Sequence, residues 1–357
     1  MGLIYPEDLE AWSSWQANAH LLRRVKNTLK HAPARLRGGK VATNTPTPVA
    51  GYLHVSGSKP HILLALDSTS PTSLGSLVRP IRYLAAGSYA VWAPEDVTAH
   101  LPEGEWAVTR LDEVELDNKL VSLRQVLALG HYMAWGGAAY RLAQRMGARF
   151  ITVQHGLHTP YAPPLAPGTH LLAFSQADAE FWISGRDDVT YDVVGSQLFW
   201  EAAKKPSVTP ADLSATPIFL GQMHGAELPR ASFAYSSIKF AREHGAVYRP
   251  HPSEKDKLSR LTHDFMGKLG VEIDRSQQPL NQVNQPVVSI FSTGVLEAAL
   301  RGIPAWVYHA NPPAWLVEFW DRYGMNQWGS APTPAPQLPE REPAEQIATI
   351  LTQTLES

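Results

Sequence analysis

Three short polar stretches carry side chains that could hold an anion or move a proton, and each directly follows a run of apolar residues. They read QHG at 154–156, RPHP at 249–252 and STG at 292–294. Apolar runs of this length are typical of buried parallel strands. Ligands of open α/β sheets bind beyond the carboxyl ends of such strands, so these stretches are the candidates for a functional site.

The RPHP stretch combines two cations with two rigid residues. Pro250 and Pro252 fix two φ angles and remove two backbone donors, so the stretch is neither strand nor helix interior. The guanidinium of Arg249 makes charge-assisted bonds to phosphate oxygens, and the imidazole of His251 can donate one more. We predict that the prolines hold these two donors toward an anion. A stiff connector between two elements is the alternative.

The STG stretch has the composition of a phosphate-binding turn. Ser292 and Thr293 supply hydroxyl groups, and Gly294 allows the backbone to approach a ligand closely. The N–H groups at the start of the following helix attract phosphate. Glu297, in the first turn of that helix, would accept hydrogen bonds from ribose hydroxyls, or would cap the helix. The stretch therefore predicts a nucleotide phosphate site.

His155 is the candidate general base. An imidazole with an ordinary pKa near 6.5 can take a proton from an acceptor hydroxyl, although a structural histidine bonded to backbone is an equal alternative. His158 and Tyr161 follow closely and are candidates for binding the acceptor. Gly221 and Gln222 come directly after another apolar run and are further candidates on the donor side.

Two successive series of strands and helices indicate an α/β protein with two Rossmann-like domains facing each other across a cleft. The C-terminal helices are expected to pack back. A polar, proline-bearing linker separates the two series. The predicted segments are an N-terminal helical segment at 1–50, an acceptor domain at 51–205, a nucleotide-donor domain at 216–315 and a helical tail at 316–357. The predicted strands include Ile62–Leu66, Tyr89–Trp92, Val126–Leu129, Phe150–Val153 and Ile218–Leu220.

Composition excludes several classes of function. The chain has 357 residues and a net charge of -2, which does not fit a general nucleic-acid binder. It has no cysteine, so disulfides, thiolate zinc sites and cysteine nucleophiles are excluded. Neither G-x-G-x-x-G after the first strand nor G-x-x-x-x-G-K-[ST] occurs, which disfavours dinucleotide oxidoreductases and P-loop NTPases.

The N-terminal segment indicates where in the cell the protein is expected. Residues 6–30 have helical spacing, and the end of this segment is basic, with Arg23, Arg24, Lys26, Lys30, Arg35, Arg37 and Lys40. It is a solvated helix face, or it is attracted to an acidic acceptor or an anionic membrane surface. The first fifteen residues lack the apolar core of a signal peptide, and the most apolar stretch is interrupted by His131 and Arg141. We expect a cytoplasmic protein, with peripheral contact to the inner membrane face through the basic segment.

The arrangement resembles the GT-B glycosyltransferases. "SIFSTGVLEAALRGIPAWVY" is similar to the donor-domain stretch of that superfamily. The RPHP and STG stretches resemble the His-Pro and Ser/Thr pairs of bacterial polysialyltransferases and Kdo transferases, which use CMP-activated acidic sugars. QHG resembles the His-Gly element of Kdo transferases and of CDP-glycerol glycerophosphotransferases. The acidic-acidic-Gly motif of the polysialyltransferases is not evident, and no D-x-D occurs.

The resemblance implies a metal-independent single displacement without a cofactor. His155 would be the base, Arg249, His251, Ser292 and Thr293 would hold the donor phosphate, and Glu297 would take the ribose. The donor would be a CMP- or CDP-linked sugar or alditol phosphate. The acceptor would be a hydroxyl of a cell-surface glycan or of a lipid-linked glycan.

Two other functions remain open at this point. A UDP-N-acetylglucosamine 2-epimerase has a similar donor site but relies on several carboxylates around the sugar, and few Asp or Glu residues stand at the predicted strand ends. A non-catalytic sugar-nucleotide-binding protein is the second. The joint presence of His155, Arg249, His251 and Glu297 weighs against it.

Overall fold

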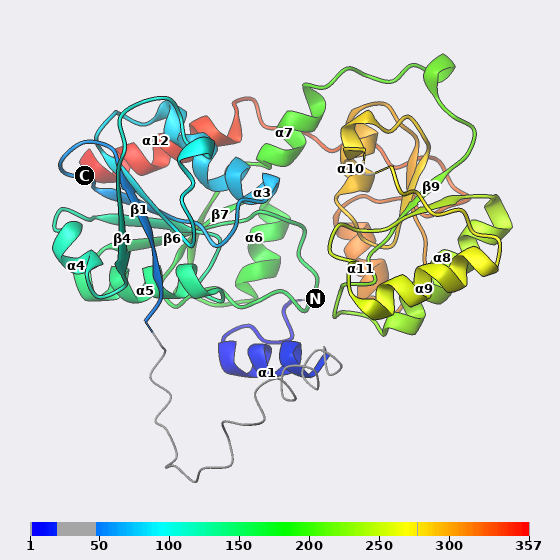
Figure 1. Cartoon of the computed structure of the whole chain (residues 1–357), viewed down its shortest axis with the longest axis horizontal. Coiled ribbons are helices and arrows are strands. Elements are labelled where there is room, and N and C mark those ends of the chain that lie inside the picture. Colours follow the sequence, from blue (N-terminus) through cyan, green and yellow to red (C-terminus); the bar gives the residue numbers. More distant parts are fainter. Residues whose placement is uncertain (1, 20–47, 277, 357) are drawn as a thin grey trace, which may run out of the picture. The chain divides into compact units, whose positions relative to one another are not determined.

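The chain forms two compact units, shown in a computed structural model that describes residues 2–19, 48–276 and 278–356 (Figure 1). The N-terminal unit consists of Gly2–His155, Tyr161–Gln197 and Pro339–Ser357, and the C-terminal unit consists of Gly156–Pro160 and Leu198–Leu338. The proline-bearing stretch that we interpreted as a linker falls inside the C-terminal unit. The predicted helical tail is shared between the two units.

An eight-stranded sheet forms the centre of the N-terminal unit, in the order β4-β1-β3-β2-β5-β6-β7-β8. The six strands from β3 to β8 in this order are parallel, as the alternation of apolar runs and helices predicted. The strands are β1 (Ala50–Val55), β2 (Ile62–Ala65), β3 (Tyr89–Ala93), β4 (Ala107–Asp112), β5 (Gln125–Ala128), β6 (Arg149–Val153), β7 (His170–Ala173) and β8 (Thr190–Val193).

Both faces of this sheet are covered. Successive residues of β2 enter different clusters: Ile62 and Leu64 pack on one side, and Leu63 and Ala65 pack on the other. Because both faces are buried, the central strands read as continuous apolar runs instead of alternating ones. This is the reason why they could be recognised in the sequence.

The antiparallel strands β1 and β4 were not among the predicted elements. β1 pairs antiparallel with β3 and with β4, and four of the six residues of β4 are exposed. A strand that is exposed over most of its length has no apolar run, so its position depends on the pairing partner and is poorly marked in the sequence.

The helix expected between β2 and β3 is divided into three short pieces, α3 (Pro71–Ser73), the π-helix η2 (Leu74–Val78) and the 3-10 helix η3 (Arg79–Tyr83). Pro80 has no N–H group to bond the carbonyl four residues earlier, so a regular α-helical ladder cannot run through this segment.

The remaining helical elements of the N-terminal unit range from 3 residues in η4 to 14 in α12. Of the predicted helix at 6–30, the described part is α1, and the basic residues between Arg23 and Lys40 lie outside the described residues. The helical elements are α1 (Leu9–Ala19), η4 (Thr98–His100), α4 (Leu116–Lys119), α5 (Ala134–Met146), α6 (Gln176–Ile183) and α12 (Pro343–Glu356). Helix α7 (Gln197–Ala203) begins at Gln197, the last residue of the segment Tyr161–Gln197, and continues into the C-terminal unit.

The C-terminal helix packs back onto the N-terminal unit, as expected. Ile347 and Leu351 of α12 are buried in the same cluster as β2 and β3, and α12 contacts η3 (Figure 1). The buried side chain of Gln125 donates a hydrogen bond to the carbonyl of Leu351, 2.8 Å away. The end of the chain therefore contributes to the same core as strands β2 and β3.

A second, fully parallel sheet forms the centre of the C-terminal unit, in the order β10-β9-β11-β12. The predicted strand Ile218–Leu220 is β9, and strands and helices follow one another through the rest of this unit, as predicted. The elements are η5 (Pro210–Asp212), β9 (Ile218–Leu220), α8 (Arg230–His244), β10 (Val247–Arg249), α9 (Lys257–Lys268), η6 (Leu280–Gln282), β11 (Val287–Ser289), α10 (Gly294–Leu300), β12 (Ala305–Val307) and α11 (Ala314–Arg322).

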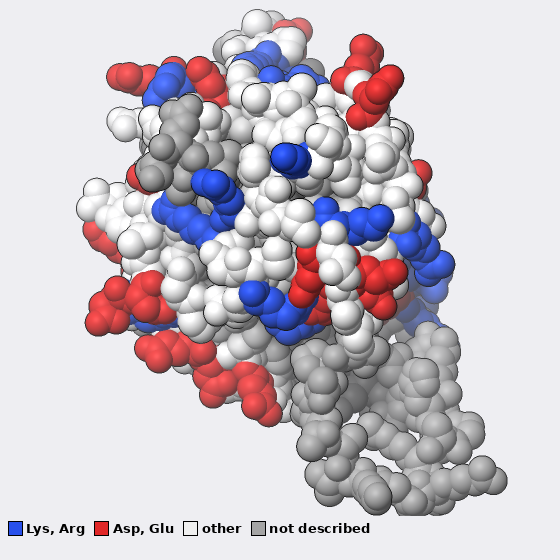
Figure 2. Space-filling model, turned by 90° about the vertical axis from the view of Figure 1, so that its left-hand side faces the viewer, with Lys and Arg blue, Asp and Glu red and all other residues white. Residues whose placement is uncertain are grey.

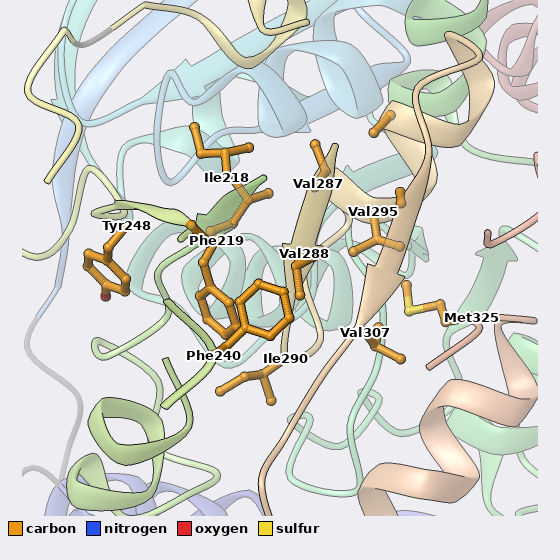
Figure 3. Packing of buried hydrophobic residues seen from close by; sticks show 14 of the residues in the cluster. Ile218, Phe219, Phe240, Tyr248, Val287, Val288, Ile290, Val295, Val307 and Met325 are labelled. Carbon is orange, nitrogen blue, oxygen red and sulfur yellow. The ribbon is translucent and has the colours of Figure 1, made fainter. Parts of the chain in front are cut away.

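One aromatic-rich cluster fills the core of this unit (Figure 3). Phe219 of β9 and Phe240 of α8 meet at its centre, with their rings 5.4 Å apart. Val288, completely buried on the neighbouring strand, packs beside them. This packing fixes the ends of the short strands, and these ends carry the polar stretches.

Charge is distributed without large single-sign areas on the face that Figure 2 shows, where lysines and arginines are interspersed with aspartates and glutamates. Within the described ranges, no helix is long and apolar enough to cross a bilayer.

Candidate functional site

A cavity of about 910 Å³ opens at the carboxyl ends of β9, β10 and β11 in the C-terminal unit. These three strands are parallel and in register, with Arg249 beside Leu220 and Leu220 beside Ser289, so the loops that follow them meet at one edge. Seven of the eight residues predicted on the donor side line this cavity: Gly221, Arg249, His251, Ser292, Thr293, Gly294 and Glu297.

Arg249 is held in place by the chain itself. Its Nη1 lies 3.3 Å from Oδ2 of Asp274, and its Nη2 donates to the carbonyl of Gln278. Burial raises the pKa of Asp274, but hydrogen bonds from Ser276 and the charge of Arg249 outweigh it, so the pKa of Asp274 is lowered overall. The guanidinium is therefore positioned before any ligand binds, with part of its charge already compensated.

His251 is held as a neutral imidazole. Its Nδ1 accepts a hydrogen bond from the N–H of Ser253, 3.1 Å away, which leaves the proton on Nε2. Burial lowers the pKa of His251, although Glu254 opposes this. Its ring stacks on that of His224, with the centroids 3.9 Å apart and the planes at 22°. Nε2 is thus the atom that can donate to an anion.

Gln222 does not line the cavity but supports the turn that does. Its Oε1 accepts hydrogen bonds from Oγ of Ser289 at 2.8 Å and from the N–H of Phe291 at 2.9 Å. Oγ of Ser289 in turn accepts from the N–H of Ser292 at 3.3 Å. Gln222 therefore connects the end of β9 to the turn after β11.

The start of α10 differs from the expected phosphate-binding helix terminus. The N–H of Gly294 donates to Oγ of Ser292 at 3.1 Å, and the N–H groups of Val295 and Glu297 donate to carbonyls of the same turn. These donors are thus used within the turn. Glycine at 294 is explained by packing, because a Cβ there would lie 2.6 Å from Cδ1 of Leu220. Ser292 and Thr293 remain among the lining residues.

Glu297 lines the cavity from the first turn of α10. Its Oε1 accepts a hydrogen bond from Oγ1 of Thr293 at 3.0 Å, which is a bond to a side-chain hydroxyl, whereas a capping glutamate accepts from a backbone N–H. Burial raises the pKa of Glu297, and the bond from Thr293 partly opposes this. The N-terminal cap residue of α10 is Thr293.

Glu254 is a buried residue of the site that the sequence did not reveal. Oε2 accepts hydrogen bonds from the hydroxyl of Tyr248 and from Nε2 of His263, each at 2.9 Å, and Oε1 accepts from the N–H of Met223 at 2.9 Å. Burial and the nearby Glu254 raise the pKa of Tyr248 well above its usual value. Gly221 is needed beside this group, because a Cβ there would lie 2.3 Å from the hydroxyl of Tyr248.

The charged residues around the cavity are more numerous than the strand ends alone indicated. Four carboxylates line it, which corrects the expectation of few acidic residues: Glu254, Asp264, Asp274 and Glu297. All except Asp264 are bonded within the unit, as described above. Three further cations also line the cavity and form no ion pair with the described residues: Lys255, Arg260 and Arg275. With Arg249, the lining therefore holds four cations and four carboxylates, and their formal charges cancel.

His155 is the last residue of its segment of the N-terminal unit. Its Nδ1 is buried and has no hydrogen-bond partner among the described residues. Burial lowers the pKa of His155 to about 4, well below the 6.5 on which its interpretation as a base relied. The imidazole is therefore neutral at physiological pH, and no carboxylate of the described ranges bonds it.

The two acceptor-side candidates belong to different units. His158 is part of the C-terminal unit, where Arg322 donates to its carbonyl at 2.7 Å and its N–H donates to the hydroxyl of Tyr323 at 2.8 Å. Tyr161 is part of the N-terminal unit, where its ring stacks on Trp15 at 4.8 Å.

Across residues 2–19, 48–276 and 278–356, no group of three or more His, Cys, Asp or Glu side chains is arranged to hold a metal ion. The neutral and cationic donors of the cavity, in contrast, suit an anionic ligand.

No protein-family model and no curated protein matches the chain. Among solved structures, it is similar to UDP-GlcNAc 2-epimerase from Methanocaldococcus jannaschii, at 13% identity and a TM-score of 0.43 over 83% of this chain and 99% of that one. It is also similar to a glycotransferase of kitacinnamycin (15% identity, TM-score 0.41, 82% of this chain and 90% of that one). A glycosyltransferase from Rickettsia africae gives 12% identity and a TM-score of 0.36 over 68% and 69% of the two chains. Likeness at this level does not extend to substrate or reaction, which only the residues of the site can indicate.

Proposed function

We propose that the chain is a glycosyltransferase that moves a sugar or an alditol phosphate from a nucleotide-activated donor to a hydroxyl of a glycan or lipid-linked acceptor. The observation that supports this most directly is the convergence of Arg249, His251, Ser292 and Thr293 on one cavity at the carboxyl edge of a parallel sheet. This edge is where open α/β sheets bind nucleotides.

The lining groups are suited to the phosphate of a donor. Arg249 offers a guanidinium and His251 offers Nε2–H. Lys255, Arg260 and Arg275 are further cationic groups of the lining that form no ion pair with a described residue. A nucleoside monophosphate or diphosphate linked to a sugar is an anion of suitable charge. Glu297 is the acceptor that would bind ribose hydroxyls, in exchange for its bond to Thr293.

In the proposed reaction the acceptor hydroxyl loses its proton to the neutral imidazole of His155. When a sugar is moved, the acceptor oxygen forms a bond to the activated carbon of the donor, and the bond from that carbon to the phosphate oxygen breaks, leaving its electron pair on the phosphate. When an alditol phosphate is moved, the acceptor oxygen forms a bond to the phosphorus next to the alditol, and the bond from that phosphorus to the oxygen of the nucleoside monophosphate breaks, leaving its electron pair on the departing phosphate. Arg249 and His251 would stabilise this negative charge. We assign the donor to the CMP- or CDP-linked class, as the resemblance of the QHG, RPHP and STG stretches implies.

A thermal-shift screen against CMP, CDP, UDP and GDP tests the donor site. A ligand present at 100 times its dissociation constant stabilises the folded state by about 2.7 kcal/mol, which is readily measured. We expect the cytidine nucleotides to give the largest shift. Because a hydrogen bond to a charged group contributes about 1.5–3 kcal/mol, Arg249→Ala should weaken binding roughly 10- to 100-fold.

Arg242→Ala is the matched control, since Arg242 is an exposed cation of the same unit outside the cavity. Equal binding by the Arg249→Ala variant, or no shift with any nucleotide, would contradict the proposal. Incubating a bound nucleotide sugar alone then separates the two enzyme classes. An epimerase converts it without an acceptor, whereas a transferase leaves it nearly unchanged.

A further inference from the structure

Helix α9 exposes an apolar face that the cavity does not use. Leu258, Leu261 and Phe265 have exposed fractions of 38%, 55% and 54%. They are three and four residues apart, so they lie on one side of the helix. The buried residues of α9 are Ser259, His263 and Met266, which face the core on the opposite side. No other described helix exposes three large apolar side chains.

Cations border this stripe. Lys257 and Lys268, at the two ends of α9, are exposed and eleven residues apart, which is close to three full turns, so they lie along the same side of the helix. Neither forms an ion pair with a described residue. Asp264 is the single exposed acidic residue within α9. We call Leu258, Leu261, Phe265, Lys257 and Lys268 the α9 outer face.

We propose that the α9 outer face docks on an anionic lipid surface. Leucine and phenylalanine side chains flanked by lysines are the combination that enters the interface of a bilayer, where the apolar groups reach the acyl boundary and the ammonium groups bind lipid phosphates. Scattered apolar side chains are normal on a surface, but three on one helical stripe are not.

Docking would also orient the cavity. Arg260, His263 and Asp264 of α9 line the cavity, and they project from a different side of the helix than the stripe. A membrane bound to the α9 outer face would therefore lie close to the cavity mouth, which suits a lipid-linked acceptor. This consequence rests on the proposed function, whereas docking itself does not.

Sedimentation of the full chain with lipid vesicles tests the proposal. We expect binding to phosphatidylcholine vesicles that contain phosphatidylglycerol, and much less binding to phosphatidylcholine alone. The variant Leu261→Ser with Phe265→Ser should bind roughly tenfold more weakly, because two of the three inserting side chains are lost. The variant Lys257→Gln with Lys268→Gln should lose most of the dependence on the anionic lipid and on salt.

Tyr235→Ser is the matched control, because Tyr235 is an exposed aromatic residue of α8, with an exposed fraction of 61%. None of these residues lines the cavity, so the nucleotide-induced thermal shift should remain in every variant, which separates this test from that of the donor site. Three results would overturn the proposal: no sedimentation of the unchanged chain, equal sedimentation of the Leu261→Ser, Phe265→Ser variant, or loss of a dimer by that variant in size-exclusion chromatography.

Discussion

At the scale of single residues, the donor-side groups and the candidate base have opposite environments. Arg249 and His251 are fixed by bonds to Asp274 and Ser253, so their donors are oriented before a ligand arrives. His155 is fixed by burial alone, and its pKa falls to about 4. A base of low pKa is unprotonated at every physiological pH but accepts a proton with less driving force than one near 7.

The low pKa of His155 therefore predicts a pH dependence of turnover that a histidine of ordinary pKa would not produce. Turnover should stay constant from neutral pH down to about pH 5.5 and fall only as the pH approaches 4, because the imidazole must be unprotonated to act. His155→Ala should slow turnover roughly 10²- to 10⁴-fold while donor affinity is unchanged. Donor consumption at saturating donor, measured against pH, checks both points.

His100→Ala is the control, since His100 is exposed on a short 3-10 helix. If the His155→Ala variant keeps turnover within a few-fold of the unchanged chain, His155 is not the base. An acid limb near pH 6.5 would point to another histidine.

At the scale of elements, the strands of the C-terminal unit are short, so the loops that follow them position much of the site. β9, β10 and β11 have three residues each, so the turns after them are held by side chains as well as by the sheet. Gln222 is the side chain that holds the turn after β11.

We predict that Gln222→Leu weakens nucleotide binding although residue 222 does not line the cavity. The hydroxyl of Ser289 and the N–H of Phe291 would lose their acceptor, which costs about 1–3 kcal/mol when such groups are buried. The turn at 292–294 would then be less ordered. Chemical denaturation and the nucleotide thermal shift measure the two effects.

Gln282→Leu serves as the control, because Gln282 is exposed on the 3-10 helix η6. Should Gln222→Leu lower the free energy of unfolding without changing nucleotide affinity, Gln222 would have a structural role only.

At the scale of the whole molecule, buried neutral histidines make stability depend on pH. Burial lowers the pKa of His131 and of His155 to about 4, against an ordinary value near 6.5. The unfolded chain binds protons at these sites first as the pH falls. The contribution of these two neutral histidines to the free energy of unfolding is therefore fully present above pH 6.5 and is lost as the pH falls toward 4.

Carboxylates with shifted pKa values also make the stability depend on pH, but at lower pH or with the opposite sign. The pKa of Asp256 is lowered to about 2, where bonds from Ser259 outweigh burial, so its contribution is lost only between about pH 4 and 2. Burial raises the pKa of Asp67, which opposes the histidines. A variant is therefore needed to isolate the histidine contribution.

We predict that the melting temperature falls between pH 6.5 and pH 4, and that His131→Gln makes this fall shallower because one buried neutral imidazole is removed. Thermal melts at a series of pH values give the slope. His100→Gln should leave the slope unchanged, and an unchanged slope for His131→Gln would show that protonation of His131 does not contribute.

The sequence by itself determined the parallel strands and the helices of the C-terminal unit, because a buried strand needs a continuous apolar run. It also determined the three polar stretches that follow strands, because a turn needs its glycines and prolines. It could not determine the antiparallel strands β1 and β4, which are positioned by pairing. Nor could it show that Glu254 and Asp274 lie beside Arg249 and Gly221, or that the N–H groups of the turn before α10 are already bonded. Hydrogen bonds and burial between residues distant in the chain exist only once the chain has folded, and the pKa of His155 follows from that burial. Only the tertiary structure could decide these features.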